Sequence, residues 1–389
     1  MANGDKPILR LLFVAPSLGA GGAERVLSIL ANAFDARGDQ VTVVTLATPE
    51  TDFYSLNPQV GRISLAGMQD SATVFQAIAN NVRRLLAIRR ALAGSHANVV
   101  ISLCDQTNIL VLLATLGLGL NIIATEHTDP RHRRLGSAWA LLRRLTYPWA
   151  SRVVMLTEPT LAWACKQWPR WRATVIPNPV HIDTPERLPA RPVFFADHTV
   201  VTLGRLHPLK GHRALIRSFS RIAQRYADWR LVIFGEGPER AVLEEQIAEL
   251  GLEHRVYLPG TVDPSASVLL HADLFVLSSR YEGFPMALLE AMALGRPCVS
   301  FDCPSGPAAI IDSGVNGILV PPGDEAALAD AMASLMNNPA ERARIGRNAR
   351  AVSERFGLER IMNQWDQLMG ECLAESEKTR KNTGEGHGR

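Results

Sequence analysis

The most informative stretch of this chain is residues 281–295, which reads YEGFPMALLEAMALG. Gly283 lets the backbone bend, and Pro285 suits the first position of a helix because its missing N–H is not needed there. The apolar run then predicts a helix that stops at Gly295. A helix that begins this way points its free N–H groups and the positive end of its dipole at one place, where an anion can bind.

Two glutamates in this stretch indicate a polar ligand. Glu282 precedes the predicted helix, and Glu290 lies about two turns further on, where it can accept hydrogen bonds from hydroxyl groups. An anion site beside a hydroxyl acceptor suits a nucleotide-sugar. The residues alone leave a second interpretation open, an ordinary buried helix with a solvated glutamate at its start.

The same stretch resembles the donor-site signature of retaining glycosyltransferases of family 4, Glu-Gly-Phe-Pro-x-x-x-x-Glu-Ala-x-Ala-x-Gly-x-Pro. The resemblance extends from Gly19 to Phe356 and is closest to bacterial enzymes that extend polyprenyl-diphosphate-linked glycans. It implies the α/β GT-B fold, two facing Rossmann-like, doubly wound parallel-sheet domains with an interdomain cleft. It also implies a retaining α-glycosyltransferase (a hexosyltransferase) that moves a sugar from a nucleotide-sugar, UDP-linked, to a glycan or polyprenyl-diphosphate-linked acceptor in polysaccharide or glycoconjugate biosynthesis.

Size and composition fit this class. A chain of 389 residues is long for a single core, and a hydrophobic content of 47% is ordinary for a globular protein. We find no secretory signal, no apolar run long enough to span a bilayer and no paired Cys/His spacing among five scattered cysteines, which predicts a cytoplasmic protein with reduced thiols. Residues 1–180 carry 18 basic and 11 acidic residues, whereas the remainder carries 23 and 27. The basic first half predicts an anionic partner, and the absence of a nucleic-acid motif argues against DNA or RNA.

Short β-branched runs alternate with helical patterns in both halves, which predicts parallel sheets covered by helices. We expect an acceptor-side Rossmann-like domain at 1–180, a Pro-rich linker at 181–198 and a nucleotide-sugar-binding domain at 199–356. A C-terminal helix at 357–374 should return to the first domain, and the polar tail at 375–389 should be disordered. Strands are predicted at Leu11–Ala15, Val41–Leu46, Val99–Leu103, Ile122–Glu126, Val153–Leu156, Thr174–Ile176, Val200–Leu203, Leu231–Phe234, Leu274–Leu277 and Cys298–Phe301.

Two cations open the second half in the motif Gly-Arg-Leu-His-Pro-Leu-Lys-Gly, residues 204–211. Arg205 supplies a bidentate fork and Lys210 a point charge, so together they can stabilise negative charge on a leaving nucleotide. The residues alone also allow isolated surface cations. In the resembled family this pair binds the donor diphosphate.

The first half offers a glycine-rich turn and a histidine after predicted strands. Glycines at 19–22 let the backbone approach a phosphate, although a plain strand-to-helix turn is the alternative. His127 follows the strand that ends in Ala-Thr-Glu. The resemblance implies that this histidine faces the reacting sugar, and that the glycine-rich loop with Glu24 faces the donor phosphates and the acceptor.

The resemblance therefore assigns the site residue by residue. Catalysis is expected from His127, Arg205, Lys210 and Glu282. Donor binding is expected from Gly21, Gly22, Asn178, Gly235, Leu258, Gly283, Phe284 and Glu290. Pro179 replaces the glycine that the family carries after the asparagine. We find no Asp-x-Asp sequence, so we expect no metal and no cofactor besides the nucleotide-sugar co-substrate, with cations and helix dipoles holding the diphosphate.

A basic and apolar surface is predicted in the first half. Residues 131–152 carry six arginines and no acidic residue, with tryptophans and leucines between them, and residues 82–92 repeat the pattern. Such helices typically lie in a membrane interface, although a solvated basic face is the alternative. We expect acceptor or membrane contacts from Glu24, Arg131, Arg133, Arg134, Arg143 and Arg144. These contacts would make the protein peripheral on the inner face of the cell membrane, bound to anionic lipid.

Two other functions fit the same fold. A UDP-sugar epimerase would need acid/base carboxylates in the cleft, and a catalytically silent GT-B binding protein would not need the intact cation and glutamate set. The sequence does not specify the transferred sugar, the nucleotide base (UDP or GDP), the acceptor, the linkage or the oligomeric state.

Overall fold

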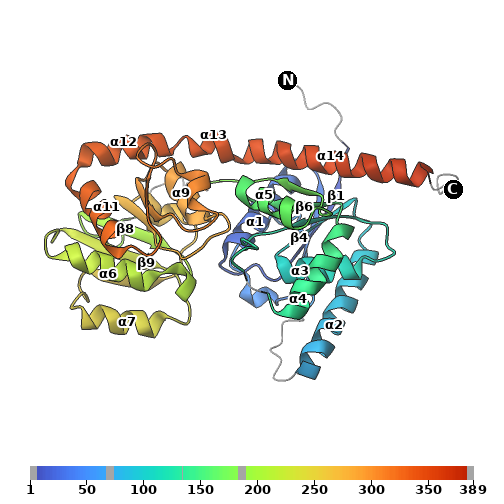
Figure 1. The fold of residues 1–389 in the computed structure, drawn as a ribbon, viewed down its shortest axis with the longest axis horizontal. Helices are drawn as coiled ribbons and strands as arrows, with labels where there is room; N and C mark the ends of the chain where they lie inside the picture. Colours follow the sequence, from blue (N-terminus) through green and yellow to red (C-terminus); the bar gives the residue numbers. More distant parts are fainter. Residues whose placement is uncertain (1–6, 67–73, 134, 183–189, 383–389) are drawn as a thin grey trace. The chain divides into compact units, whose positions relative to one another are not determined.

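The computed structural model describes residues 7–66, 74–133, 135–182 and 190–382. The chain divides into two compact units, one of residues 1–177 with 361–389 and the other of residues 178–360 (Figure 1). Each unit is built on one parallel sheet with helices packed against it. The expectation of an α/β protein with two doubly wound parallel sheets is confirmed.

Within the described residues, the sheet of the first unit has seven strands in the order β3-β2-β1-β4-β5-β6-β7. The strands are β1 (Arg10–Ala15), β2 (Gln40–Thr45), β3 (Gly61–Ser64), β4 (Val99–Leu103), β5 (Asn121–Thr125), β6 (Arg152–Met155) and β7 (Ala173–Val175). The helices are α1 (Gly22–Ala36), α2 (Val74–Ala93), α3 (Asp105–Ala114), α4 (Ser137–Thr146), α5 (Glu158–Gln167) and the long α14 (Leu358–Asn382), with short 3-10 turns η1 (Pro49–Thr51) and η2 (Tyr147–Trp149). Helix α3 contacts both α2 and α4.

The sheet of the second unit, again among the described residues, has six strands in the order β10-β9-β8-β11-β12-β13. The strands are β8 (His198–Leu203), β9 (Trp229–Phe234), β10 (Val256–Gly260), β11 (Leu274–Leu277), β12 (Cys298–Phe301) and β13 (Ile318–Val320). The helices are α6 (His212–Ala223), α7 (Arg240–Glu249), α8 (Ala266–Leu269), α9 (Met286–Ala293), α10 (Pro307–Ile310), α11 (Glu325–Asn337), α12 (Pro339–Ala349) and α13 (Val352–Phe356), with the 3-10 turn η3 (Pro208–Lys210).

The burial of a strand determines whether it could be predicted from the sequence. The central strands β4, β11 and β12 are buried at every residue, because helices cover both faces of a parallel sheet. All ten predicted strands are present, with ends within two residues of those expected. Strands β3, β10 and β13 were not predicted, and each forms an edge of its sheet where half of its residues or more are not fully buried.

The boundary between the units lies between Pro177 and Asn178, earlier than the predicted linker. Residues 190–198 of that linker belong with the second unit and pack onto it, whereas residues 183–189 lie outside the described part. Phe195 is 7% exposed, and its ring centroid lies 6.3 Å from that of Phe234. The expected free linker over 181–198 is therefore wrong for these residues, because an aromatic contact holds them.

The C-terminal helix is longer than the sequence suggests. Helix α14 continues to Asn382, so the disorder expected from residue 375 is wrong for 375–382, and residues 383–389 lie outside the described part. Glu375 explains the extension, since its carboxylate lies 2.7 Å from Arg152 and 2.9 Å from Arg172. Residues from Ile361 onward group with the first unit.

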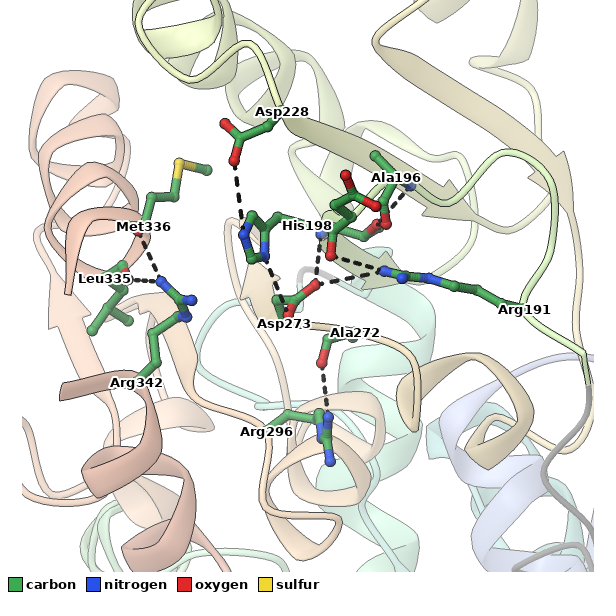
Figure 2. A network of polar contacts seen from close by, with 12 residues as sticks. Arg191, Ala196, His198, Asp228, Ala272, Asp273, Arg296, Leu335, Met336 and Arg342 are labelled. Atoms are coloured by element: carbon green, nitrogen blue, oxygen red, sulfur yellow. Dashed lines mark hydrogen bonds and ion pairs between the residues drawn. The ribbon is translucent and has the colours of Figure 1, made fainter. Parts of the chain in front are cut away.

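A polar network fixes the amino ends of the strands in the second unit (Figure 2). His198, the first residue of β8, lies 3.7 Å from Asp228 and 3.6 Å from Asp273, and its ring stacks on Trp229 at the start of β9. Asp273 also accepts a hydrogen bond from the backbone N–H of Thr199. This network ties β8, β9 and β11 together at one edge, which leaves the loops at the opposite, carboxyl edge available for a ligand.

Candidate functional site

The second unit holds an ion pair at the carboxyl edge of its sheet. The Nζ of Lys210, in the loop after β8, lies 2.6 Å from Oε1 of Glu282, in the loop after β11. The hydroxyl of Ser279 donates to the same oxygen at 2.6 Å. Because β8 and β11 are neighbours in the sheet, their following loops meet, so the structure brings together two residues that are 72 positions apart. Lys210 thus has a fixed place, with further N–H donors left for a ligand.

Glycines let this loop approach its neighbours. Gly211 has φ 68°, and a Cβ there would lie 2.0 Å from the carbonyl oxygen of Ser278. Gly235, after β9, has φ 149°, and its Cβ would lie 2.0 Å from the carbonyl oxygen of Gly204. Any side chain at either position would force the backbones apart, so the loop after β8 is held between those after β9 and β11 by contacts that only glycine permits.

Arg205 has an exposed side chain in the same loop. Within the described residues its guanidinium makes no hydrogen bond or ion pair, in contrast to Lys210. Its backbone carbonyl lies 3.2 Å from Nε2 of His212, a residue of α6 that is 1% exposed. The sequence analysis did not single out His212. It anchors the loop from which the Arg205 side chain extends.

Glu290 and the start of α9 form the second part of this site. Glu290 is 5% exposed, and its Oε2 accepts a 2.7 Å hydrogen bond from the hydroxyl of Ser265, which the sequence analysis also missed. Helix α9 begins at Met286, one residue after the predicted Pro285. Among the described residues, the backbone N–H groups of Gly283 and Phe284 donate no hydrogen bond. They are therefore available to a ligand.

The remaining predicted donor contacts in this unit differ in availability. The carbonyl oxygen of Leu258 already accepts a 3.1 Å bond from Arg240, in a segment where β10 shifts register against β9. Asn178 is 4% exposed, and nearby Val180 donates from its backbone to Phe356. In the described part of the chain, neither Asn178 nor Leu258 forms a hydrogen bond with Lys210 or Glu282.

In the first unit, the glycine-rich turn leads directly into α1. Gly21 is the residue before α1, and a Cβ at this position would lie 2.2 Å from Oε2 of Glu24. Gly22 is the first residue of the helix. Oε1 of Glu24 accepts a 3.0 Å bond from the hydroxyl of Ser17, so this carboxylate folds back over the turn. The turn thus presents both backbone and an acidic group at the carboxyl end of β1.

His127 follows β5 at the same edge of the sheet. Its Nε2 lies 3.0 Å from the hydroxyl oxygen of Thr125, and that hydroxyl donates to the carbonyl of Ser102. Thr125 must then accept from the histidine, which assigns the hydrogen to Nε2 and leaves Nδ1 as an acceptor. Burial lowers the pKa of His127 to about 4, so the imidazole is neutral near pH 7. Nδ1 is buried and has no hydrogen-bond partner among the described residues.

The predicted arginine surface is only partly exposed. Arg133 lies 2.6 Å from Asp105, and Arg131 lies 2.9 Å from Asp129, so buried carboxylates 28 and 2 positions away neutralise them. Arg144 is exposed, and Arg134 lies outside the described residues.

Arg143, which was expected to contact the acceptor or a membrane, is buried. This residue is 6% exposed, its guanidinium lies over the rings of Trp168 and Trp171, and it lies 3.9 Å from Glu126. The prediction that Arg143 contacts acceptor or membrane is wrong, because its side of α4 faces the interior.

Cys104 and Asp105 are further site neighbours that the sequence analysis missed. Both follow β4, between the loops after β1 and β5, at the carboxyl edge of the sheet. Cys104 has φ 72°, a conformation rarely adopted by residues other than glycine, and such strain concentrates at functional sites. Polar residues directly after the predicted strand Val99–Leu103 were the signal that could have identified them.

Two family models match the chain, one described as Glycosyltransferase Family 4 at residues 20–184 and one described as Glycosyl transferases group 1 at residues 191–352. The chain belongs to the family 4 glycosyltransferases. A Campylobacter jejuni relative is 27% identical over 94% of this chain and 99% of its own length. That relative is an α-1,4-N-acetyl-D-galactosaminyltransferase named for the acceptor GalNAc-α-(1→4)-GalNAc-α-(1→3)-diNAcBac-PP-undecaprenol.

Solved structures of low identity support the fold of this family 4 glycosyltransferase. Sucrose-phosphate synthase from Thermosynechococcus elongatus superimposes with a TM-score of 0.80 at 21% identity, covering 94% of this chain and 100% of that one. Anabaena HepE, solved in complex with UDP, gives 0.72 at 20% identity, covering 93% and 100%. The protein therefore has the GT-B fold, and it is a glycosyltransferase of polysaccharide or glycoconjugate synthesis.

We expect the buried His212 to make the stability of the second unit sensitive to acid. Burial lowers the pKa of His212 to about 4, so below its usual pKa near 6.5 the unfolded chain binds the proton more readily than the folded one. The contribution of His212 to the free energy of unfolding is therefore complete above pH 6.5 and is lost as the pH falls toward 4. At about 1.4 kcal/mol per pKa unit, the loss is on the order of 3 kcal/mol. His212→Gln keeps a donor for the Arg205 carbonyl but does not titrate.

Urea unfolding between pH 4 and 7 measures this effect. The free energy of unfolding of His212→Gln should depend less on pH than that of the unaltered protein, whereas His254→Gln, at an exposed histidine, should not change the slope. Equal slopes in all three proteins would contradict the assignment.

Proposed function

We propose that this glycosyltransferase moves a sugar from a UDP-sugar to a polyprenyl-diphosphate-linked glycan with retention of anomeric configuration. The observation that carries the proposal is the ion pair of Lys210 with Glu282, in the loop that also carries Arg205, whose guanidinium has no partner among the described residues. Two cations in one loop at the carboxyl edge of the sheet suit a diphosphate, and Glu290 beside Ser265 suits ribose hydroxyls. UDP bound to HepE and the acceptor named for the Campylobacter relative support the two substrates.

The proposed chemistry relies on stabilising the leaving group. Arg205 and Lys210 take up the negative charge that develops on the departing diphosphate, while Glu282 keeps the Lys210 amine in place. The N–H groups of Gly283 and Phe284 bind the transferred sugar. The acceptor attacks from the face that the diphosphate leaves, and a diphosphate oxygen takes the acceptor proton. His127 faces the sugar as a neutral imidazole.

Lys210→Ala should lower kcat by about 100-fold, since one fixed donor on developing charge contributes about 3 kcal/mol to the transition state. Transfer from a panel of nucleotide-sugars to an undecaprenyl-diphosphate-linked glycan is measured, and the anomeric configuration of the product is read by NMR. Lys166→Ala, at an exposed lysine of α5, is the matched control and should retain full activity.

The same assay separates the two alternative functions. Conversion of the UDP-sugar without any acceptor would identify an epimerase. Donor binding without turnover by the unaltered protein would identify a silent binding protein. Full turnover by a folded Lys210→Ala variant would contradict the site assignment.

We expect catalysis without a divalent cation. Arg205 and Lys210 occupy the role that a metal ion plays elsewhere, as fixed positive charges on the diphosphate. Turnover should therefore be unchanged in excess EDTA after passage over a chelating resin. A loss that Mn²⁺ or Mg²⁺ restores would contradict this expectation, and an EDTA-inhibited metalloenzyme run in parallel shows that chelation was complete.

We propose that the exposed faces of α2 and α4 attach the protein to an anionic membrane. On α2, Phe75 is 86% and Ile78 is 57% exposed, and on α4, Leu141 is 58% and Leu145 is 54% exposed. Both helices contact α3. Apolar residues beside exposed arginines suit an interface with anionic lipid headgroups. The arginines concerned are Arg83, Arg90 and Arg144.

Attachment at this surface would make the enzyme peripheral, on the inner face of the cell membrane, where a polyprenyl-linked acceptor is held in the bilayer. No helix in the described part of the chain is long and apolar enough to cross a bilayer.

A liposome sedimentation assay tests the attachment. The double variant Phe75→Ser/Leu141→Ser should bind vesicles of anionic phospholipid at least tenfold more weakly, because two large apolar side chains no longer enter the interface. Val193→Ser/Leu250→Ser removes two exposed apolar residues from the second unit and should bind like the unaltered protein. Equal binding by all three proteins would exclude this surface.

A further inference from the structure

A closed ring of hydrogen bonds lies at the end of β5. The amide Nδ2 of Asn108 donates to the backbone carbonyl of Thr125 at 2.9 Å and to the hydroxyl of Tyr147 at 3.1 Å. The Tyr147 hydroxyl in turn donates to Oε1 of Glu126 at 2.5 Å. Because Thr125 and Glu126 are consecutive, these three bonds close a ring that begins and ends on one peptide.

The ring is deeply buried and packs against the hydrophobic cluster of the unit. Asn108 and Tyr147 are fully buried, and Thr125 and Glu126 are each 2% exposed. Tyr147 belongs to the main hydrophobic cluster of the unit, and its ring centroid lies 4.5 Å from that of Trp171. An ionisable carboxyl in such a place costs stability that an apolar side chain would not. The buried carboxyl of Glu126 is therefore better explained by a function than by packing.

The ring lies directly behind the histidine of the site. Side chains alternate along an extended chain, so Thr125 and His127 point to one side and Glu126 to the other. The Thr125 hydroxyl holds Nε2 of His127, while the ring holds the Thr125 carbonyl. The peptide that leads into His127 is thus restrained from both sides, and with it the direction of the imidazole.

Arg143 completes the arrangement from α4. Its guanidinium lies 3.9 Å from Oε1 of Glu126 and is held over two tryptophan rings. Burial raises the pKa of Glu126 to about 7, while Arg143, the Tyr147 hydroxyl and Arg133 lower it and Asp105 raises it. The charges around Glu126 therefore come from α3, α4 and the loop after β5.

We propose that Glu126 and Tyr147 are positioning residues that hold the imidazole of His127 in one orientation. The proposal rests on the proposed function for the role of His127, but the state of the imidazole can be observed without any substrate. Neither residue contacts substrate in this scheme. Both act through the Thr125–Glu126 peptide.

Tyr147→Phe tests the proposal with the least change of volume. It removes the donor to Glu126 and should lower kcat about tenfold while KM for the nucleotide-sugar changes less than twofold. Tyr226→Phe is the matched control, because Tyr226 is 7% exposed and its hydroxyl donates to a single carbonyl, that of Ala333, in the other unit. The control should lose similar thermal stability and keep its kcat.

A second readout is the ¹⁵N spectrum of histidine-labelled protein, with the signal of His127 assigned by His127→Ala. We expect the same His127 signal in the unaltered protein and in Tyr226→Phe, and a shifted or broadened signal in Tyr147→Phe, because the ring no longer fixes the backbone before His127. An unchanged His127 signal together with unchanged kcat in Tyr147→Phe would overturn the proposal. If the unaltered protein transfers no sugar, the proposed function fails, and the spectrum alone still decides the positioning role.

Two substitutions of Glu126 separate the hydrogen bond from the packing. Glu126→Gln keeps an oxygen that accepts from Tyr147, whereas Glu126→Leu does not. Glu126→Gln should retain at least several-fold more kcat than Glu126→Leu and should keep the His127 signal of the unaltered protein. Equal kcat and equal spectra in the two variants would overturn the role of the ring.

Discussion

The ion pair between Lys210 and Glu282 is the contact on which the proposed donor site depends. Its two partners lie 72 positions apart and meet because β8 and β11 are hydrogen-bonded neighbours whose carboxyl ends reach the same edge. The loops approach closely enough only because Gly211 and Gly235 leave room for neighbouring carbonyls. A side chain at either glycine would separate the loops and therefore the charges. The order of the strands and the close packing of the loops together therefore fix the position of the Lys210 amine.

The sequence predicted the interior of the fold well and its margins poorly. Strands such as β4 and β11 are buried at every residue and are almost wholly apolar in sequence, so their predicted ends agree with those in the structure. Edge strands such as β13 are short and partly exposed, and their hydrophobic pattern is correspondingly weak. The extension of α14 past residue 374 depends on Glu375 meeting Arg152, a contact 223 positions apart that no local pattern reveals.

The residues of the candidate site also differ in how well the sequence predicts them. Motifs placed directly after strands, as with Lys210, Glu282 and His127, could be found because parallel strands bring their following loops to one edge. The arginine-rich segment could not be interpreted from charge alone. Arg143 lies one residue from the exposed Arg144, yet its side of the helix faces Glu126 and two tryptophans. Which arginine is buried depends on tertiary partners that the segment does not contain.

Helix α4 therefore carries two different surfaces. Leu141 and Leu145 are exposed, whereas Arg143 between them reaches the buried carboxyl of Glu126. The exposed leucines and the buried guanidinium are therefore held in a fixed relation to one another by the same helix. Because the guanidinium and carboxylate are 3.9 Å apart in a medium of low polarity, small displacements of α4 change their interaction strongly.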